Sequence, residues 1–148
     1  MSEVVENLDW DDVWEPNAPE AAVLWQDDVA ALALRAHPDD ADKRCVVLVF
    51  DQPVHVAGGP CSDEGRNHHR LYEVGLRDVL WVGVVHRSQL VAEKQHAWTR
   101  VTADGLRLVP VHYVVLTKES VIEVLAANLQ AVRVEAESTR HAALEALA

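Results

Sequence analysis

Apolar residues recur at helical spacing in the first quarter of the chain. Between residues 20 and 36, apolar side chains fall every three or four positions, and acidic or amide residues lie between them. Pro19 and Glu20 suit a first helical turn. His37 precedes Pro38, and a residue before proline avoids helical backbone angles. This pattern predicts a helix over 20–36.

A second helical pattern runs to the end of the chain. Thr117 can cap a helix through its hydroxyl, and apolar residues then follow at helical spacing. The pattern predicts one helix over 118–147, which is much longer than the roughly 11–12-residue average. A single domain of this size cannot cover all of such a helix, so we expect its distal half to pack on a second copy of the chain or, alternatively, to fray. The expected interface residues are Leu125, Leu129, Val132 and Leu144.

Continuous apolar runs in the middle of the chain predict strands. Residues 45–50 are all apolar, and residues 79–86 carry apolar side chains on both faces of an extended chain. Residues 96–102 and 106–116 predict a β-hairpin closed by a loop that ends in Gly105. The predicted fold class is therefore α+β. It has an antiparallel sheet of about four to five strands, one N-terminal helix and one long C-terminal helix.

Charge is concentrated at the N-terminus. The 148 residues carry a net charge of -11, and the first 28 contain nine acidic residues and no basic one. We therefore divide the chain into an acidic, Trp-containing arm, residues 1–18, and a single α+β domain, residues 19–148. The arm is expected to bind a protein partner with a basic surface, because charge complementarity speeds encounter and Trp often anchors interfaces. The expected contacts are Trp10, Asp11, Asp12, Trp14 and Glu15. Alternatively, the arm folds back and covers its own core with the two Trp side chains.

Several classes of protein are disfavoured by the same composition. No apolar run approaches the roughly 18 residues of a membrane span, so we expect no membrane partner. The acidic start does not resemble a secretory signal, and a cytoplasmic location is expected. Two cysteines without C-x-x-C spacing predict reduced thiols. Without a basic stripe, the chain is not expected to bind nucleic acid.

Histidines give the main candidate for chemistry. In the predicted hairpin His96 and His112 lie opposite each other, and His86 near the end of another strand could join them. Three histidines on one sheet face can bind catalytic zinc. A second candidate set of ligands is the 61–70 loop, which holds Cys61 together with acidic residues and histidines. The alternative is a half-exposed histidine pair that binds no cofactor.

The sequence favours a small, soluble, non-enzymatic interaction or assembly protein. It would bind its partner through the acidic arm and form a homodimer through the C-terminal helix, with no cofactor. The alternative is a zinc-dependent hydrolase that uses the histidine cluster. A weaker alternative is an inhibitor that imitates nucleic acid through its acidic residues.

Overall fold

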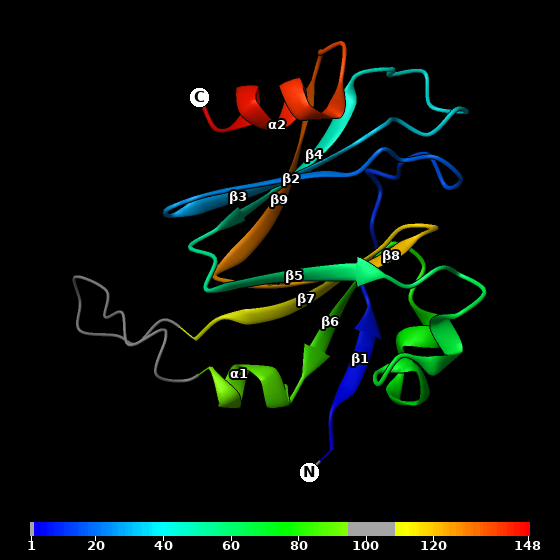
Figure 1. The fold of residues 1–148 in the computed structure, drawn as a ribbon, viewed down its shortest axis with the longest axis vertical. Helices are drawn as coiled ribbons and strands as arrows, with labels where there is room; N and C mark the ends of the chain where they lie inside the picture. Colours follow the sequence, from blue (N-terminus) through cyan, green and yellow to red (C-terminus); the bar gives the residue numbers. More distant parts are fainter. Residues whose placement is uncertain (1, 95–108) are drawn as a thin grey trace.

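Two antiparallel sheets packed face to face dominate the computed structural model, which describes residues 2–94 and 109–148 (Figure 1). The five-stranded sheet has the order β1 (Val4–Asn7), β6 (Val82–His86), β7 (Val111–Leu116), β8 (Ser120–Ala126) and β5 (His55–Pro60). The four-stranded sheet has the order β2 (Ala22–Gln26), β3 (Val29–Leu34), β4 (Cys45–Asp51) and β9 (Asn128–Val134). The described chain is therefore mostly β, and the predicted α+β class is wrong.

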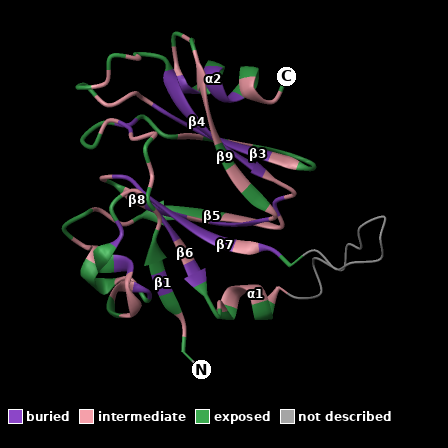
Figure 2. Cartoon of the chain, turned by 180° about the vertical axis from the view of Figure 1, so that it is seen from behind, coloured by how far each residue is buried: buried purple, intermediate pink, exposed green. Residues whose placement is uncertain are grey.

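The main core lies between the two sheets. Strands β3 and β4 contribute Leu32, Leu48 and Phe50, and the facing strands β7 and β8 contribute Tyr113 and Ile122. The rings of Phe50 and Tyr113 meet edge to face, with centroids 5.9 Å apart. Strands that are buried on both faces read as continuous apolar runs, which is why the run at 45–50 was predicted correctly as a strand. Figure 2 shows these buried strands through the middle of the molecule.

The outer faces of the two sheets are covered differently. Helix α2 (Thr139–Ala146) lies on the four-stranded sheet, where Ala142 and Ala143 pack against Ala31 and Ala33 of β3. Small side chains on both sides let the helix approach the sheet closely. The five-stranded sheet is covered by the 3-10 turns η1 (Arg66–His68), η2 (Tyr72–Val74) and η3 (Leu76–Asp78) and flanked by the short helix α1 (Gln89–Glu93). Gly75 lies between η2 and η3 at φ 129°, and a Cβ there would collide with the carbonyl oxygen of Val5 in β1.

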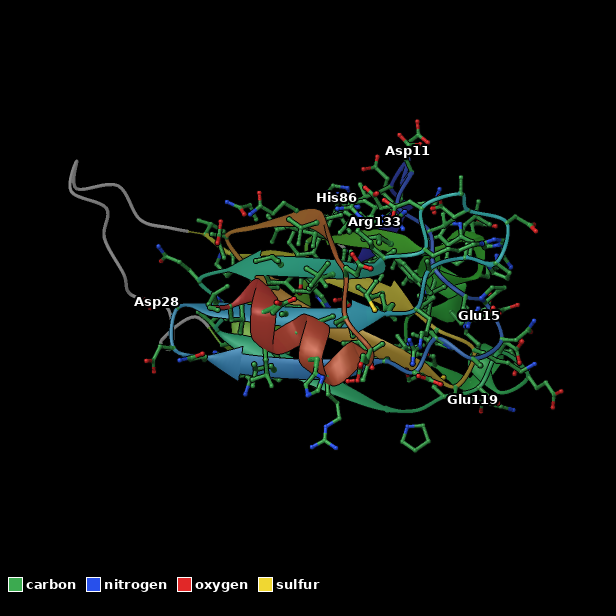
Figure 3. All side chains as sticks on the ribbon, turned by 90° about the horizontal axis from the view of Figure 1, so that it is seen from above. Asp11, Glu15, Asp28, His86, Glu119 and Arg133 are labelled. Carbon is green, nitrogen blue, oxygen red and sulfur yellow. The ribbon has the colours of Figure 1, made fainter. Side chains whose placement is uncertain are left out.

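The N-terminal segment connects the two sheets. After β1 pairs with β6, the chain crosses to the four-stranded sheet, where Trp14 forms a bridge with Ala36 and the Glu15 amide donates to the Arg35 carbonyl. The Trp14 side chain is 1% exposed and donates its indole N–H to the Leu116 carbonyl oxygen at 3.2 Å. The acidic residues of this segment remain at the surface, and Asp11 points outward in Figure 3.

The predicted helix over 20–36 is a β-hairpin. Strands β2 and β3 pair through a two-residue loop in which Asp27 has φ 49°, a left-handed conformation that Asp tolerates better than most residues. Successive residues of β3 point alternately to the inter-sheet core and to the side covered by α2. Apolar side chains are therefore packed on both faces of this strand. The helical spacing of 20–36 was therefore coincidental.

The predicted long helix over 118–147 is wrong for most of its length. Residues 120–126 and 128–134 form β8 and β9, and only Thr139–Ala146 is helical. Valine and isoleucine are frequent in β8, and such β-branched residues favour a pleated, buried strand. In the predicted hairpin, the second strand is present as β7. Residues 96–108, including the first strand and its loop, lie outside the described part of the chain.

Candidate active site

A serine lies at a sharp junction between a strand and a helix. Strand β6 ends at His86, Arg87 has the left-handed φ of 54°, and Ser88 then begins α1. Left-handed backbone costs a non-glycine residue roughly 1–2 kcal/mol, and such strain is concentrated at functional sites. The Ser88 Oγ accepts the Val91 amide N–H at 3.1 Å and so caps the helix. A strand-to-helix turn is also where some hydrolases carry their nucleophile, but here the left-handed residue is Arg87 and Ser88 itself is extended.

The Ser88 hydroxyl is hydrogen-bonded to a buried histidine. Its Oγ lies 2.6 Å from Nδ1 of His112, whose side chain is 0% exposed on β7. The other ring nitrogen, Nε2, lies 2.8 Å from Oε1 of Glu123 on the neighbouring strand β8. With Nε2 donating to the carboxylate, Nδ1 is the acceptor that can receive the Ser88 proton. The three side chains form a continuous Ser–His–Glu hydrogen-bond chain.

The Glu123 side chain is mostly buried, with 12% of its surface exposed, and yet it is held as a carboxylate. Burial raises its pKa, but the hydrogen bonds from His112 and Arg70 outweigh burial and hold the pKa at about 2. Arg70 makes the stronger contact, with two N–H···O bonds of 2.8 and 2.6 Å from its guanidinium to the two carboxylate oxygens. The ionised carboxylate thus fixes the orientation of the His112 ring.

Two further histidines surround this carboxylate. His69 Nε2 lies 3.8 Å from Glu123 Oε2, and burial lowers the pKa of His69. His55 on β5 lies in the same cross-strand row as His112, with Leu125 between them. Burial and then the charge of Lys94 lower the pKa of His55. Both pKa shifts favour the neutral form of these two imidazoles. Among the described residues, Arg70 is therefore the only cation that binds both oxygens of the Glu123 carboxylate.

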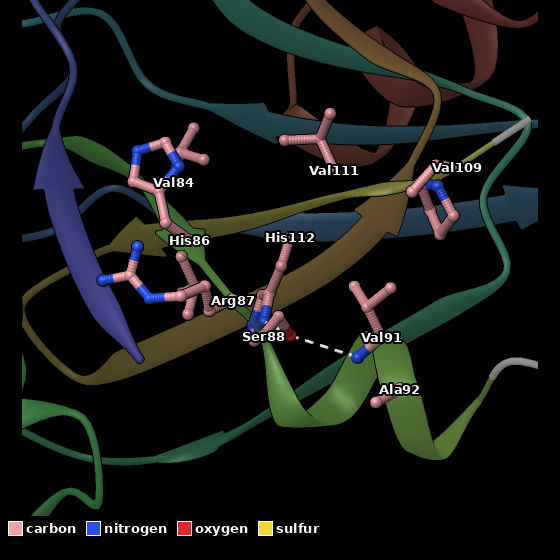
Figure 4. Close-up of a pocket in the computed structure, with 11 residues that line it drawn as sticks. Val84, His86, Arg87, Ser88, Val91, Ala92, Val109, Val111 and His112 are labelled. Atoms are coloured by element: carbon pink, nitrogen blue, oxygen red, sulfur yellow. Dashed lines mark hydrogen bonds between the residues drawn. The ribbon is translucent and has the colours of Figure 1, made fainter. Parts of the chain in front are cut away.

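A pocket of about 590 Å³ opens beside the serine and the histidine (Figure 4). Most of its walls are aliphatic, with Val84 from β6, Val91 from α1 and Val111 from β7. The polar residues of this lining are His86, Arg87, Ser88 and His112. Binding sites commonly combine apolar walls with a few convergent polar groups. The pocket can therefore hold an apolar group of a substrate next to the serine hydroxyl.

The N-terminal segment reaches the backbone beside the serine. The amide of Gln89, the residue after Ser88, donates to the Glu3 carboxylate at 2.9 Å, and the Arg87 guanidinium donates to the Ser2 carbonyl at 2.8 Å. In serine hydrolases with a strand–turn–helix nucleophile, the amide after the nucleophile stabilises the oxyanion. Here the Glu3 carboxylate accepts the hydrogen bond of the Gln89 amide and so occupies the position of such an oxyanion.

The predicted partner-binding residues do not form one exposed surface. Trp14 is buried in the inter-sheet core, and Trp10 is half-buried against it. Asp12 lies 3.6 Å from the Arg133 guanidinium, and Glu15 accepts the Asn17 amide through its side chain. Only Asp11 is fully exposed among the five residues. This arrangement corresponds to an arm that covers its own core.

The predicted self-association residues lie on three different elements. Leu125 on β8 is 0% exposed, whereas Leu144 on α2 is 56% exposed. Leu129 and Val132 lie on β9, an edge strand of the four-stranded sheet, where they point to opposite faces. The four residues therefore do not form the single helical stripe that the sequence predicted.

The predicted zinc ligands are not brought together. His86 is exposed and lies 3.3 Å from Glu6 Oε1, on the opposite face of the sheet from His112, because Val85 is the β6 residue that pairs with His112. His96 lies outside the described residues. Within residues 2–94 and 109–148, no three His, Cys, Asp or Glu side chains are grouped so that they could hold a metal ion. This includes the 61–70 loop.

Of the Ser–His–Glu set, sequence reasoning identified only His112. Ser88 lacks the Gly-x-Ser-x-Gly context in which such a nucleophile is usually recognised. The available signal was a serine two residues after a strongly apolar strand, followed by residues that can begin a helix. Glu123 could not be found, because the segment that contains it was assigned to a helix rather than to the strand beside β7.

Comparisons with known proteins add no relative. No protein-family model matches the chain, and neither the curated proteins nor the solved structures include a match. In the part of the chain that the structure describes, none of the helices has the length and apolar character needed to cross a membrane.

Proposed function

We propose that this protein is a serine hydrolase that cleaves esters with apolar acyl groups. The observation that carries the proposal is the hydrogen-bond chain Ser88–His112–Glu123, with contacts of 2.6 and 2.8 Å, at the end of an apolar pocket. Ser88 is the nucleophile, His112 is the general base and acid, and Glu123 positions His112. Arg70 in turn positions Glu123.

The reaction follows from these contacts. Ser88 Oγ attacks the ester carbonyl carbon while its proton moves to His112 Nδ1. The bond to the leaving alkoxide breaks, and the alcohol departs with the proton from Nδ1. Water then attacks the acyl-serine and gives a proton to Nδ1, and collapse of this intermediate releases the carboxylic acid and restores the Ser88 hydroxyl. The Glu123 carboxylate stabilises the imidazolium that forms in both half-reactions.

The pocket favours acyl groups long enough to contact its aliphatic walls. These walls come from β6, β7 and α1, and the volume of about 590 Å³ is within the range of small-molecule sites. Contact with them removes apolar surface of the acyl chain from water. We therefore expect butyryl or hexanoyl esters to be better substrates than acetyl esters.

Covalent labelling with a fluorophosphonate probe tests the nucleophile. The folded, tag-free protein should react with one equivalent of the probe, and peptide mass spectrometry should find the adduct on Ser88. Ser88→Ala should abolish the labelling. Ser138→Ala is the matched control, because Ser138 caps α2 in the same way, by accepting the His141 amide at 3.1 Å, but has no histidine partner among the described contacts.

Two outcomes would contradict the proposal. One is labelling of the wild type no faster than that of the urea-unfolded chain. The other is a Ser88→Ala variant that folds and is labelled as fast as the wild type. Circular dichroism of each variant establishes that loss of labelling is not loss of folding.

The functions expected from the sequence stay predictions. Binding of a basic protein partner by the acidic arm, formation of a homodimer, a zinc-dependent activity and imitation of nucleic acid are not tested by any contact described above. Light scattering coupled to size-exclusion chromatography measures the oligomeric state directly. A monomer at high micromolar concentration would remove the homodimer.

A further inference from the structure

A second pocket lies at the other end of β6, away from Ser88. Its volume is about 160 Å³, and Trp14, Trp81 and Leu116 form its apolar side. Arg66 from η1 and Lys118 from the turn between β7 and β8 form its basic side. Trp81 directly precedes β6, whereas Ser88 follows its last residue by two positions, so the two pockets are separated by the length of the strand.

The two basic side chains in this pocket have no carboxylate partner. Arg66 uses one guanidinium nitrogen, Nη2, to donate to the Thr117 carbonyl at 3.0 Å, while its Nε is buried without any hydrogen-bond partner. Neither Arg66 nor Lys118 forms an ion pair with a described residue, although Asp63 also lines the pocket. Buried unsatisfied donors are rare in folded proteins, and a bound water or ion is among their explanations.

Several other described cations also form no ion pair with a described residue, among them Lys43, Arg87, Lys94 and Arg140, so Arg66 and Lys118 stand out because they share one pocket. The net charge is -11, and Arg35, Arg44, Arg70 and Arg133 all lie within 3 Å of a carboxylate oxygen. Carboxylates are abundant, yet the only one at this pocket is Asp63, and it pairs with neither cation. An anion bound between Arg66 and Lys118 would balance the positive charge that Asp63 alone does not neutralise.

The apolar side of the pocket is mostly aromatic and would contact the uncharged part of a ligand. The Trp14 and Trp81 rings meet edge to face, with centroids 5.1 Å apart. Trp81 is half-buried, and Leu80 beside it is 71% exposed. A flat apolar group can contact Trp81 and Leu80 and remove part of their surface from water. About 160 Å³ is too small for a peptide or a nucleotide.

We propose that this pocket binds a small aromatic carboxylate. The carboxylate lies by Arg66 and Lys118, since a planar guanidinium matches the geometry of a carboxylate, and the ring lies against Trp81. This site is independent of the Ser88 pocket and does not rest on the proposed hydrolase activity.

Titration with sodium benzoate at constant ionic strength tests the site. In ¹H–¹⁵N spectra of the full chain, the Trp81 indole and the amides of Thr117 and Lys118 should shift saturably. Benzamide, which has the same shape without the charge, should bind at least about tenfold more weakly, since it loses a charged hydrogen bond. Inorganic phosphate, which has the charge without the ring, should also bind at least about tenfold more weakly.

Matched variants identify the residues. Lys118→Gln should weaken benzoate binding about tenfold. Arg140→Gln removes a charge from α2 behind the other sheet and should leave binding unchanged. Trp81→Leu should weaken benzoate and leave any phosphate binding unaltered. The proposal is overturned if benzoate gives no saturable shift, if benzamide or phosphate binds as tightly, or if Lys118→Gln and Arg140→Gln have equal effects.

Discussion

The two helices begin with the same capping contact in different surroundings. Ser88 caps α1 and Ser138 caps α2, and each Oγ accepts an amide N–H three residues further on at 3.1 Å. Helix α2 packs its alanines on an apolar sheet face, and the Ser138 hydroxyl has no further described contact. The Ser88 hydroxyl also meets a buried histidine at 2.6 Å. Capping therefore explains Ser138 completely and Ser88 only in part.

The surroundings of the two caps differ in what the sheet buries. Beneath α2 the four-stranded sheet presents alanine and valine, which need no polar partner. Near α1 the five-stranded sheet presents His112 and Glu123, and burying such groups costs free energy unless each is hydrogen-bonded. In the Ser88–His112–Glu123 set, both imidazole nitrogens and both carboxylate oxygens have a hydrogen-bond partner, and Arg70 supplies two of these bonds. The difference indicates that stability alone does not account for the face near α1.

The largest contrast is expected between Ser88→Ala and Ser138→Ala. Loss of the nucleophile should lower kcat for p-nitrophenyl butyrate by at least about a thousandfold, because the acyl-serine can no longer form. Ser138→Ala should leave kcat within about twofold. Both variants lose a cap and should lose roughly 1 kcal/mol of unfolding free energy. Equal kcat values for the two variants would remove the distinction between the caps.

Glu123→Gln should have the next largest effect. The amide N–H₂ can donate to His112 Nε2, which moves the ring proton to Nδ1 and leaves no acceptor for the Ser88 hydroxyl. We expect kcat to fall about a hundredfold or more with little change in KM. Glu119→Gln, at an exposed position in the turn before β8, is the control and should retain full activity. A Glu123→Gln variant with wild-type kcat would show that His112 is not positioned by this carboxylate.

Acid should destabilise the wild type through Glu123. Its pKa is about 2 in the folded protein and near 4.5 when unperturbed, so its stabilisation is complete above about pH 4.5 and is lost as the pH falls toward 2. The shift corresponds to about 3 kcal/mol. Urea unfolding at several pH values should show the wild type losing more stability over this interval than Glu123→Gln. Identical pH profiles for the two proteins would contradict this role.

The smallest expected effect comes from Glu3. Its carboxylate accepts the amide of Gln89, which is the expected oxyanion donor. Glu3→Ala should free this donor and raise kcat about threefold, since one additional hydrogen bond becomes available to the transition state. Glu6→Ala, which removes the contact between Glu6 on β1 and His86 on β6, should leave kcat unchanged. A fall in kcat for Glu3→Ala would mean that Glu3 supports the site instead of blocking it.

Patterns that depend on one segment were the most predictable part of this fold. The run at 45–50 and most of the run at 79–86 are strands, because a stretch that is apolar on both sides must be buried on both sides. His112 was singled out correctly as a residue on a sheet. The break at His37-Pro38 also falls outside regular structure. These features follow from local chain geometry and from the apolar character of the residues.

Segments whose apolar spacing fits both a helix and a strand could not be assigned from the sequence. Residues 20–36 and 120–134 place apolar residues at spacings that satisfy both a helix and a strand with two buried faces. Alanine-rich β3 favours a helix in isolation, but pairing with β4 and contact with α2 outweigh that preference. The choice therefore depended on which partner strands were available.

The sequence by itself determined that the chain buries a large β-rich middle section and carries its excess negative charge at the N-terminus. Only the tertiary structure decided that the acidic segment crosses between the two sheets and that Ser88, His112 and Glu123 meet. Cross-strand register sets these distances, and register is a property of paired strands, which no single segment of sequence contains.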